Sequence, residues 1–184
     1  MFLTPQSAVD SNLLLSNLIT FQKDYEFLRD NRMFYDYNNM DDIVENRRDT
    51  GHFWQVAPFI YNKELLSGLP DEFANLETVK IIQSLKVQPI LATFSVLKPY
   101  SKIDDHEDHD EDCIAGVDDT YVIKYHLGID VTGTAGLVVN NEASTVETGK
   151  LNVFNESMPH YAYNNSSKDR CVLILSFLAS DLYE

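Results

Sequence analysis

Basic residues are scarce in this chain of 184 residues: 14 Lys and Arg stand against 29 Asp and Glu, which gives a formal net charge of −15. Proteins that bind nucleic acid through its phosphates need basic patches, and proteins that bind anionic membrane surfaces need them too. We therefore expect neither nucleic acid nor a membrane among the partners of this protein.

Cysteines and long apolar runs are also nearly absent. Cys113 lies in an acidic stretch and Cys171 in an apolar one, and two such residues do not make a disulfide framework. No apolar run approaches the ~20 residues that a membrane-spanning helix needs. The first residues lack the basic region and apolar core of a secretory signal. These absences predict a protein of the reducing cytoplasm.

The length suits one domain that buries most of its apolar surface and needs no disulfides or structural metal ions to fold. We expect a single domain over residues 1–184, with a helical and covering segment at 1–50 and a β-rich core at 51–180. Asp10 or Ser11 can cap a helix whose apolar residues recur every three or four positions. These residues are Leu13, Leu14, Leu18, Phe21, Tyr25 and Leu28. Residues 31–49 show no clear periodicity and are expected to form a covering loop.

Short apolar stretches separated by Gly, Asn, Ser and Asp fill the rest of the chain and predict strands. We expect strands at 53–59, 87–97, 120–131, 136–140, 150–155 and 170–178, a short helical turn at 62–69 and a helix at 76–85. Many short strands are typical of a sandwich or jelly roll, and helices that precede strands pack outside the sheets. The predicted fold class is mainly β with flanking helices.

Three separated residues have the pattern of a metal centre. Seven of the nine residues from Asp104 to Asp112 are acidic, and a run of like charges is usually only a solvated loop. However, His106 and Asp108 are two positions apart, so both side chains point to one face of an extended segment. With His160 they make a 2-His-1-carboxylate set, which leaves positions on Fe(II) open for a substrate and O2.

Two alternatives to this metal centre are less favoured by the residues. His109 is three residues from His106, but its parity places it on the opposite face of an extended chain, so it ranks below Asp108. A Ca²⁺ site would suit the carboxylates, but histidines are poor Ca²⁺ ligands.

A second cluster predicts an anion pocket. Arg170 begins a stretch that is apolar on both faces and therefore buried, where a charge needs a partner. That partner is either an acidic neighbour or a bound carboxylate, such as that of a keto acid, which Arg holds in bidentate geometry. Ser95 lies in the middle of a buried strand, and its hydroxyl also needs a partner. Lys124 and His126 share one face of their strand and are compatible if His126 is neutral and an anion lies between them.

Taken together, these segments resemble the aspartyl/asparaginyl β-hydroxylase family of Fe(II)/2-oxoglutarate-dependent oxygenases. The matching segments lie at 94–100, 103–106, 126–129, 147–150, 153–157, 160–164 and 170, and the resemblance runs from about 54 to 178. It implies a double-stranded β-helix of the jelly-roll, cupin-like kind with iron in its mouth. It also implies that His106 and His160 bind the iron, that Arg170 and Ser95 hold the distal carboxylate of 2-oxoglutarate, and that His126 lies near the carboxylate at the iron.

The chain departs from the animal member of that family in several ways. Asp108 adds a carboxylate ligand that the animal enzyme lacks, and Lys124 replaces an Arg. The helical repeats that recruit folded protein substrates are missing, and an acidic insertion separates His106 from His126. The resemblance therefore does not identify the substrate. Related small members hydroxylate free amino acids such as proline, or short peptides.

The expected function is a 2-oxoglutarate-dependent dioxygenase that uses Fe(II) and O2 to hydroxylate an amino acid, either free or as Asp, Asn or Pro in a peptide or protein. Two alternatives stay open: a non-enzymatic binding module of the same fold, and an iron enzyme that does not use 2-oxoglutarate. The acidic insertion at 107–119 is expected to border the mouth of the site, either as a mobile lid that favours ammonium-bearing substrates or as a solubilising edge.

Overall fold

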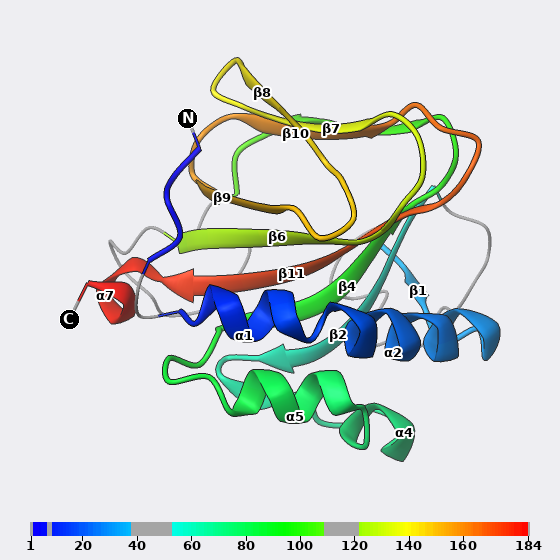
Figure 1. Ribbon diagram of the computed structural model, residues 1–184, viewed down its shortest axis with the longest axis vertical. Helices are drawn as coiled ribbons and strands as arrows, with labels where there is room; N and C mark the ends of the chain where they lie inside the picture. Colours follow the sequence, from blue (N-terminus) through cyan, green and yellow to red (C-terminus); the bar gives the residue numbers. More distant parts are fainter. Residues whose placement is uncertain (1, 7–8, 38–52, 109–121, 184) are drawn as a thin grey trace.

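Two antiparallel sheets face each other in the computed structural model, which describes residues 2–6, 9–37, 53–108 and 122–183 (Figure 1). Within these residues, the larger sheet has the strand order β1-β2-β4-β11-β6-β9, with β3 paired to β2, and the smaller has the order β5-β10-β7-β8. The strands of the larger sheet are β1 (Tyr35–Asp36), β2 (Trp54–Tyr61), β3 (Glu64–Leu65), β4 (Leu91–Leu97), β6 (Val122–Val131), β9 (Leu151–Asn155) and β11 (Arg170–Leu178). The strands of the smaller sheet are β5 (Ser101–His106), β7 (Ala135–Val139), β8 (Glu142–Thr145) and β10 (His160–Asn164). This arrangement is a double-stranded β-helix, as predicted.

Alternate residues of the larger sheet serve two different cores, because successive side chains of a strand point to opposite faces. On β11, Cys171 and Leu173 pack toward the helices, whereas Val172 and Ile174 pack toward the smaller sheet. Leu137 and Ala162 of the smaller sheet join that inner core. Both faces of β11 are therefore buried, as its apolar sequence predicted. The inner face carries the polar residues of the site.

The helices lie on the outer face of the larger sheet (Figure 1). They are α1 (Ser11–Ser16), α2 (Leu18–Asp30), α4 (Asp71–Ala74), α5 (Glu77–Gln83) and α7 (Ala179–Leu182). Asp10 caps α1 as predicted, because its Oδ1 accepts a hydrogen bond of 2.9 Å from the Leu13 amide. The expected single helix is broken at Asn17, whose side-chain amide donates to the Leu13 carbonyl at 2.8 Å. Among the described residues, no helix is long and apolar enough to cross a membrane.

Two local predictions were wrong. The helical turn expected at 62–69 is instead a hairpin between β2 and β3, in which Asn62 and Lys63 have φ values of 51° and 66°. Such left-handed pairs match the twist of a two-residue hairpin, and Asn accepts that conformation readily. The covering loop expected at 31–49 contains β1, which pairs with β2, while residues 38–49 lie outside the described residues.

Candidate metal centre and anion pocket

His106 and His160 lie directly opposite each other on the neighbouring strands β5 and β10. Their ring centroids are 4.2 Å apart. Nδ1 of His106 is 2.7 Å from the Asp104 carbonyl oxygen, and Nδ1 of His160 is 2.8 Å from that of Met158. A carbonyl accepts a hydrogen bond, so each Nδ1 carries a proton and each Nε2 is the ring nitrogen left to face the cluster. Backbone carbonyls orient metal-binding histidines in this way in many proteins.

Asp108 completes this cluster. Its Oδ1 is 3.7 Å from Nε2 of His106, and its Oδ2 is 3.7 Å from Nε2 of His160. One ligand atom from each of the three residues lies within 4.8 Å of the other two. Two imidazoles and a carboxylate that converge from one side fit the facial donor set of non-haem Fe(II). Cys171, the one cysteine among the described residues, faces the helices, so its thiol does not compete for the ion.

The charges around the cluster favour the protonation states that a metal ion needs. Burial by itself raises the pKa of the Asp108 carboxyl, but the nearby ammonium of Lys124, with smaller effects of His160 and His106, brings that pKa below its ordinary value. Burial and the charge of Lys124 lower the pKa of His160 from 6.5 to about 4. At neutral pH, Asp108 is therefore ionised and His160 is neutral.

Lys124 has two carboxylate partners. Its ammonium forms an ion pair with Oδ2 of Asp108 and lies 3.2 Å from Oε2 of Glu156, which is itself buried. The sequence predicts an anion between Lys124 and His126, and both residues line one cavity, where Lys124 also pairs with Asp108 and Glu156. Glu156 was not predicted as part of the site. A buried Lys needs hydrogen-bond partners, and that need could have pointed to a nearby carboxylate such as Glu156.

His126 is buried and neutral. Burial, followed by the charges of Arg170 and Lys124, lowers its pKa well below 6.5. Neither of its ring nitrogens has a hydrogen-bond partner among the described residues. A buried polar ring without partners costs free energy, so this position is expected to serve a bound molecule.

Arg170 opens β11 and is only 2% exposed. Its Nε and Nη2 have no hydrogen-bond partner in the described part of the chain, and no acidic residue there forms an ion pair with it. Burial lowers the pKa of its guanidinium from 12.5 to about 10. Of the two partners considered for Arg170, the acidic neighbour is therefore not found among the described residues.

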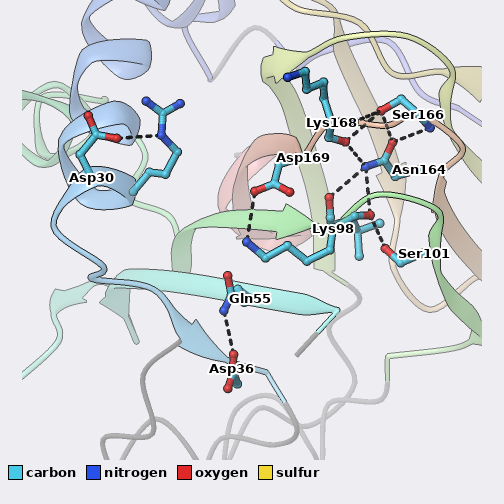
Figure 2. A network of polar contacts seen from close by, with 11 residues as sticks. Asp30, Asp36, Gln55, Lys98, Ser101, Asn164, Ser166, Lys168 and Asp169 are labelled. Carbon is cyan, nitrogen blue, oxygen red and sulfur yellow. Dashed lines mark hydrogen bonds and ion pairs between the residues drawn. The ribbon is translucent and has the colours of Figure 1, made fainter. Parts of the chain in front are cut away.

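A network of amide hydrogen bonds fixes the place where Arg170 enters the sheet (Figure 2). The buried side-chain amide of Asn164 donates to the carbonyls of Leu97 at 3.0 Å, Lys98 at 3.1 Å and Lys168 at 2.7 Å. The Lys98 ammonium also contacts Asp169 at 3.1 Å. These bonds tie the turn between β10 and β11 to the end of β4, so Arg170 is held beside the strand that carries Ser95.

Ser95 has a partner that the sequence analysis did not identify. Nε1 of Trp54, on the adjacent strand β2, donates a hydrogen bond of 3.0 Å to Oγ of Ser95. Because the indole is a donor only, the Ser95 hydroxyl accepts this bond and keeps its own proton to donate elsewhere. Trp54 is the one tryptophan of the chain. Trp54 packs against the inner core from β2, and this inward-facing position was the signal that could have pointed to its contact with Ser95.

All seven residues that the sequence singled out line one cavity of about 110 Å³. They are His106, Asp108, His160, Lys124, His126, Ser95 and Arg170. Apolar side chains, among them Leu91, Leu137 and Ile174, form the rest of the wall. The cavity therefore joins a candidate metal centre to a buried cation without a described partner. His109 and the part of the acidic insertion after Asp108 lie outside the described residues.

Comparison with known proteins identifies a family. The model of the aspartyl/asparaginyl beta-hydroxylase family matches residues 18–180. A search among curated proteins finds no match.

Several solved structures are similar at low sequence identity. The cupin domain of an XRE-family transcriptional regulator from Enterobacter cloacae is 20% identical, with 47% of this chain and 79% of that chain covered and a TM-score of 0.36. The plu4264 protein from Photorhabdus luminescens is 13% identical, with 73% and 82% covered and a TM-score of 0.45. Salicylate 1,2-dioxygenase from Pseudoaminobacter salicylatoxidans is 13% identical, with 47% and 21% covered and a TM-score of 0.35.

Proposed function

The chain belongs to the aspartyl/asparaginyl β-hydroxylase family, and from this premise we propose that it is an Fe(II)/2-oxoglutarate-dependent dioxygenase that hydroxylates an amino acid. The observation that carries the proposal is Arg170, a buried guanidinium without a described partner that lines the same cavity as His106, Asp108 and His160. A metal centre alone would not need such a cation. A co-substrate with a second carboxylate would need it.

In this proposal, His106, Asp108 and His160 would hold the iron through two Nε2 atoms and one carboxylate oxygen. When bound, the iron supplies activation of O2, coupled to the oxidative decarboxylation of 2-oxoglutarate and the hydroxylation of a substrate C–H bond. The carbonyls of Asp104 and Met158 keep the two imidazoles in the tautomer that offers Nε2. The apolar wall of the cavity keeps bulk water away from the reacting groups.

Arg170 would bind the distal carboxylate of 2-oxoglutarate, and Ser95 would donate its hydroxyl proton to the same group. The bond from Trp54 supports this role, because it leaves the Ser95 proton available. Neutral His126 lines the same cavity and would offer a ring N–H to the carboxylate nearer the iron. Charge-assisted bonds of this kind are about twice as strong as neutral ones, and bidentate pairing with Arg adds orientation.

The substrate proposed is a free amino acid, such as proline, or an Asp, Asn or Pro residue in a peptide. Exposed Asp105 and Glu107 lie on either side of His106 and border a surface hollow with Pro159. Their charges would favour a substrate that carries an ammonium group over an anionic one.

The decisive experiment measures succinate formation from 2-oxoglutarate with Fe(II) under air, first without substrate and then with a panel of free amino acids and short peptides. The proposal expects succinate that depends on both Fe(II) and 2-oxoglutarate and increases with one class of substrate. Binding of 2-oxoglutarate without turnover would instead indicate a binding module. Substrate oxidation without a requirement for 2-oxoglutarate would indicate an iron enzyme of another class.

A further inference from the structure

Lys124 shares an oxygen atom with the candidate metal centre. Its ammonium pairs with Oδ2 of Asp108, and the same oxygen is 3.7 Å from Nε2 of His160. Of the two Asp108 oxygens, Oδ1 faces Nε2 of His106 and Oδ2 faces Nε2 of His160, so a cation held between Asp108 and His160 would approach Oδ2. An ammonium and a divalent metal ion repel each other at such a distance inside a protein, so the two compete for Oδ2.

Glu156 offers the ammonium a second partner. Its Oε2 lies 3.2 Å from Nζ of Lys124, and its side chain is only 4% exposed. The backbone of Glu156 is also anchored, because its N–H donates to the Val122 carbonyl at 3.1 Å and its carbonyl accepts from the Asp108 amide at 3.3 Å. Glu156 therefore holds both the main chain of Asp108 and the ammonium that neutralises the Asp108 side chain.

We propose that Lys124 is an internal counter-ion that competes with the metal for Asp108, and that Glu156 receives its ammonium when the metal binds. This inference rests on the metal centre of the proposed function. A buried ammonium that lost Asp108 without another partner would be costly. The Glu156 carboxylate on its other side removes most of this cost, because the ammonium needs only a side-chain rotation to remain paired. The position of the Lys124 ammonium between Asp108 and Glu156 then determines how tightly the site binds the metal.

The two residues consequently have opposite effects on metal affinity. Lys124→Met removes the competitor and leaves additional negative charge near the ion, so it should bind the metal more tightly. Glu156→Gln removes the carboxylate that receives the ammonium, so Lys124 stays on Asp108 and binding should weaken. Residues just outside a metal's ligands typically change affinity by about 10- to 100-fold, and we expect changes of this size in each direction. If Lys124 and Glu156 were only a structural ion pair, both substitutions would weaken binding.

The test is calorimetric titration of Mn²⁺ into metal-free protein without 2-oxoglutarate, so that it does not depend on turnover. Lys63→Met, which breaks a partly exposed pair with Asp181 outside the cavity, is the matched control and should bind Mn²⁺ as the natural protein does. Loss of binding in His160→Ala establishes that the titrated site is the proposed one. If the natural protein binds Mn²⁺ but shows no 2-oxoglutarate turnover, the proposed function fails while this inference is still tested.

Tighter binding by Lys124→Met together with weaker binding by Glu156→Gln supports the inference. Unchanged or weaker binding by Lys124→Met, or unchanged or tighter binding by Glu156→Gln, overturns it. If Lys124→Met does not fold, Lys124→Gln keeps a polar side chain in its place and the same outcomes apply.

Discussion

Replacing Arg170 with Met should stabilise the protein and abolish its response to 2-oxoglutarate. Met keeps much of the length of the side chain and removes the charge, and the guanidinium has no described partner to lose. Burial lowers the pKa of Arg170 from 12.5 to about 10, and since a tenfold change in a protonation equilibrium is worth about 1.4 kcal/mol, burying the charged form costs about 3 kcal/mol. Removal of that cost should raise the melting temperature by several degrees, at about 2–4 °C per kcal/mol for a chain of this size.

The same substitution should weaken binding of 2-oxoglutarate. Loss of one partner of a buried, hydrogen-bonded ion pair costs about 2–5 kcal/mol, which corresponds to a rise in the dissociation constant of about 30-fold to several thousand-fold. A ligand that binds only the folded state raises its melting temperature. Added 2-oxoglutarate should therefore raise the melting temperature of the Mn²⁺-loaded natural protein and leave that of Arg170→Met unchanged.

Thermal unfolding with and without 2-oxoglutarate measures both effects in one assay. Arg29→Met is the matched control, because Arg29 is a half-exposed arginine that pairs with Asp30 outside the cavity. It should change neither the melting temperature by more than a degree or two nor the response to 2-oxoglutarate. The reasoning is refuted if Arg170→Met lowers the melting temperature and the variant still responds to 2-oxoglutarate as the natural protein does.

Three further predictions concern the metal, the pH and the packing. His106→Ala and His160→Ala should lose both bound Fe(II) and turnover in metal analysis and succinate assays, while His109→Ala keeps both; metal loss in His109→Ala but not in Asp108→Ala would reassign the ligands. The pKa of His160 is about 4 in the folded protein and 6.5 in the unfolded chain, so between these pH values only the unfolded chain binds the proton. The free energy of unfolding of the metal-free protein should therefore fall as the pH drops from 6.5 to 4, by about 1.4 kcal/mol per pH unit. Urea unfolding should show a shallower pH dependence in His160→Gln, and an unchanged slope would contradict the assignment. A Cβ on Gly128 would lie 2.0 Å from the Glu147 carbonyl oxygen, so Gly128→Ala should lower the free energy of unfolding by about 1–3 kcal/mol. Equal midpoints of urea unfolding for the variant and the natural protein would show that the backbone at Glu147 moves aside at no cost.

Local pattern in the sequence was enough for the elements whose cause is local. Apolar runs predicted β4 and β11, because a strand buried on both faces must be apolar at nearly every position. Shorter stretches bounded by turn residues predicted β2, β6, β7 and β9. The three- and four-residue spacing of apolar residues from Leu13 to Leu28 predicted the N-terminal helices, because residues at this spacing lie on one face of a helix. Strands β5, β8 and β10 were not among the predicted strands, because they are short and carry many polar residues, and only pairing with a neighbour makes them strands.

The sequence also supplied the chemistry of the site. The spacing of His106 and Asp108 predicted that both face one side, and the charge of Arg170 on an apolar strand predicted the need for an anion. Residue types and short spacings carry such information, because a ligand's donor atoms and a buried charge's requirements do not depend on the fold.

Only the tertiary structure decided which of these groups meet. His160 lies opposite His106 because β5 and β10 pair in that register, although 54 residues separate them in the chain. Lys124 pairs with Asp108 and Glu156 because β6 pairs with β9 and the Asp108 amide donates to the Glu156 carbonyl. Trp54 reaches Ser95 through the pairing of β2 with β4. Contacts between distant strands depend on register and burial, and neither is written in the local sequence.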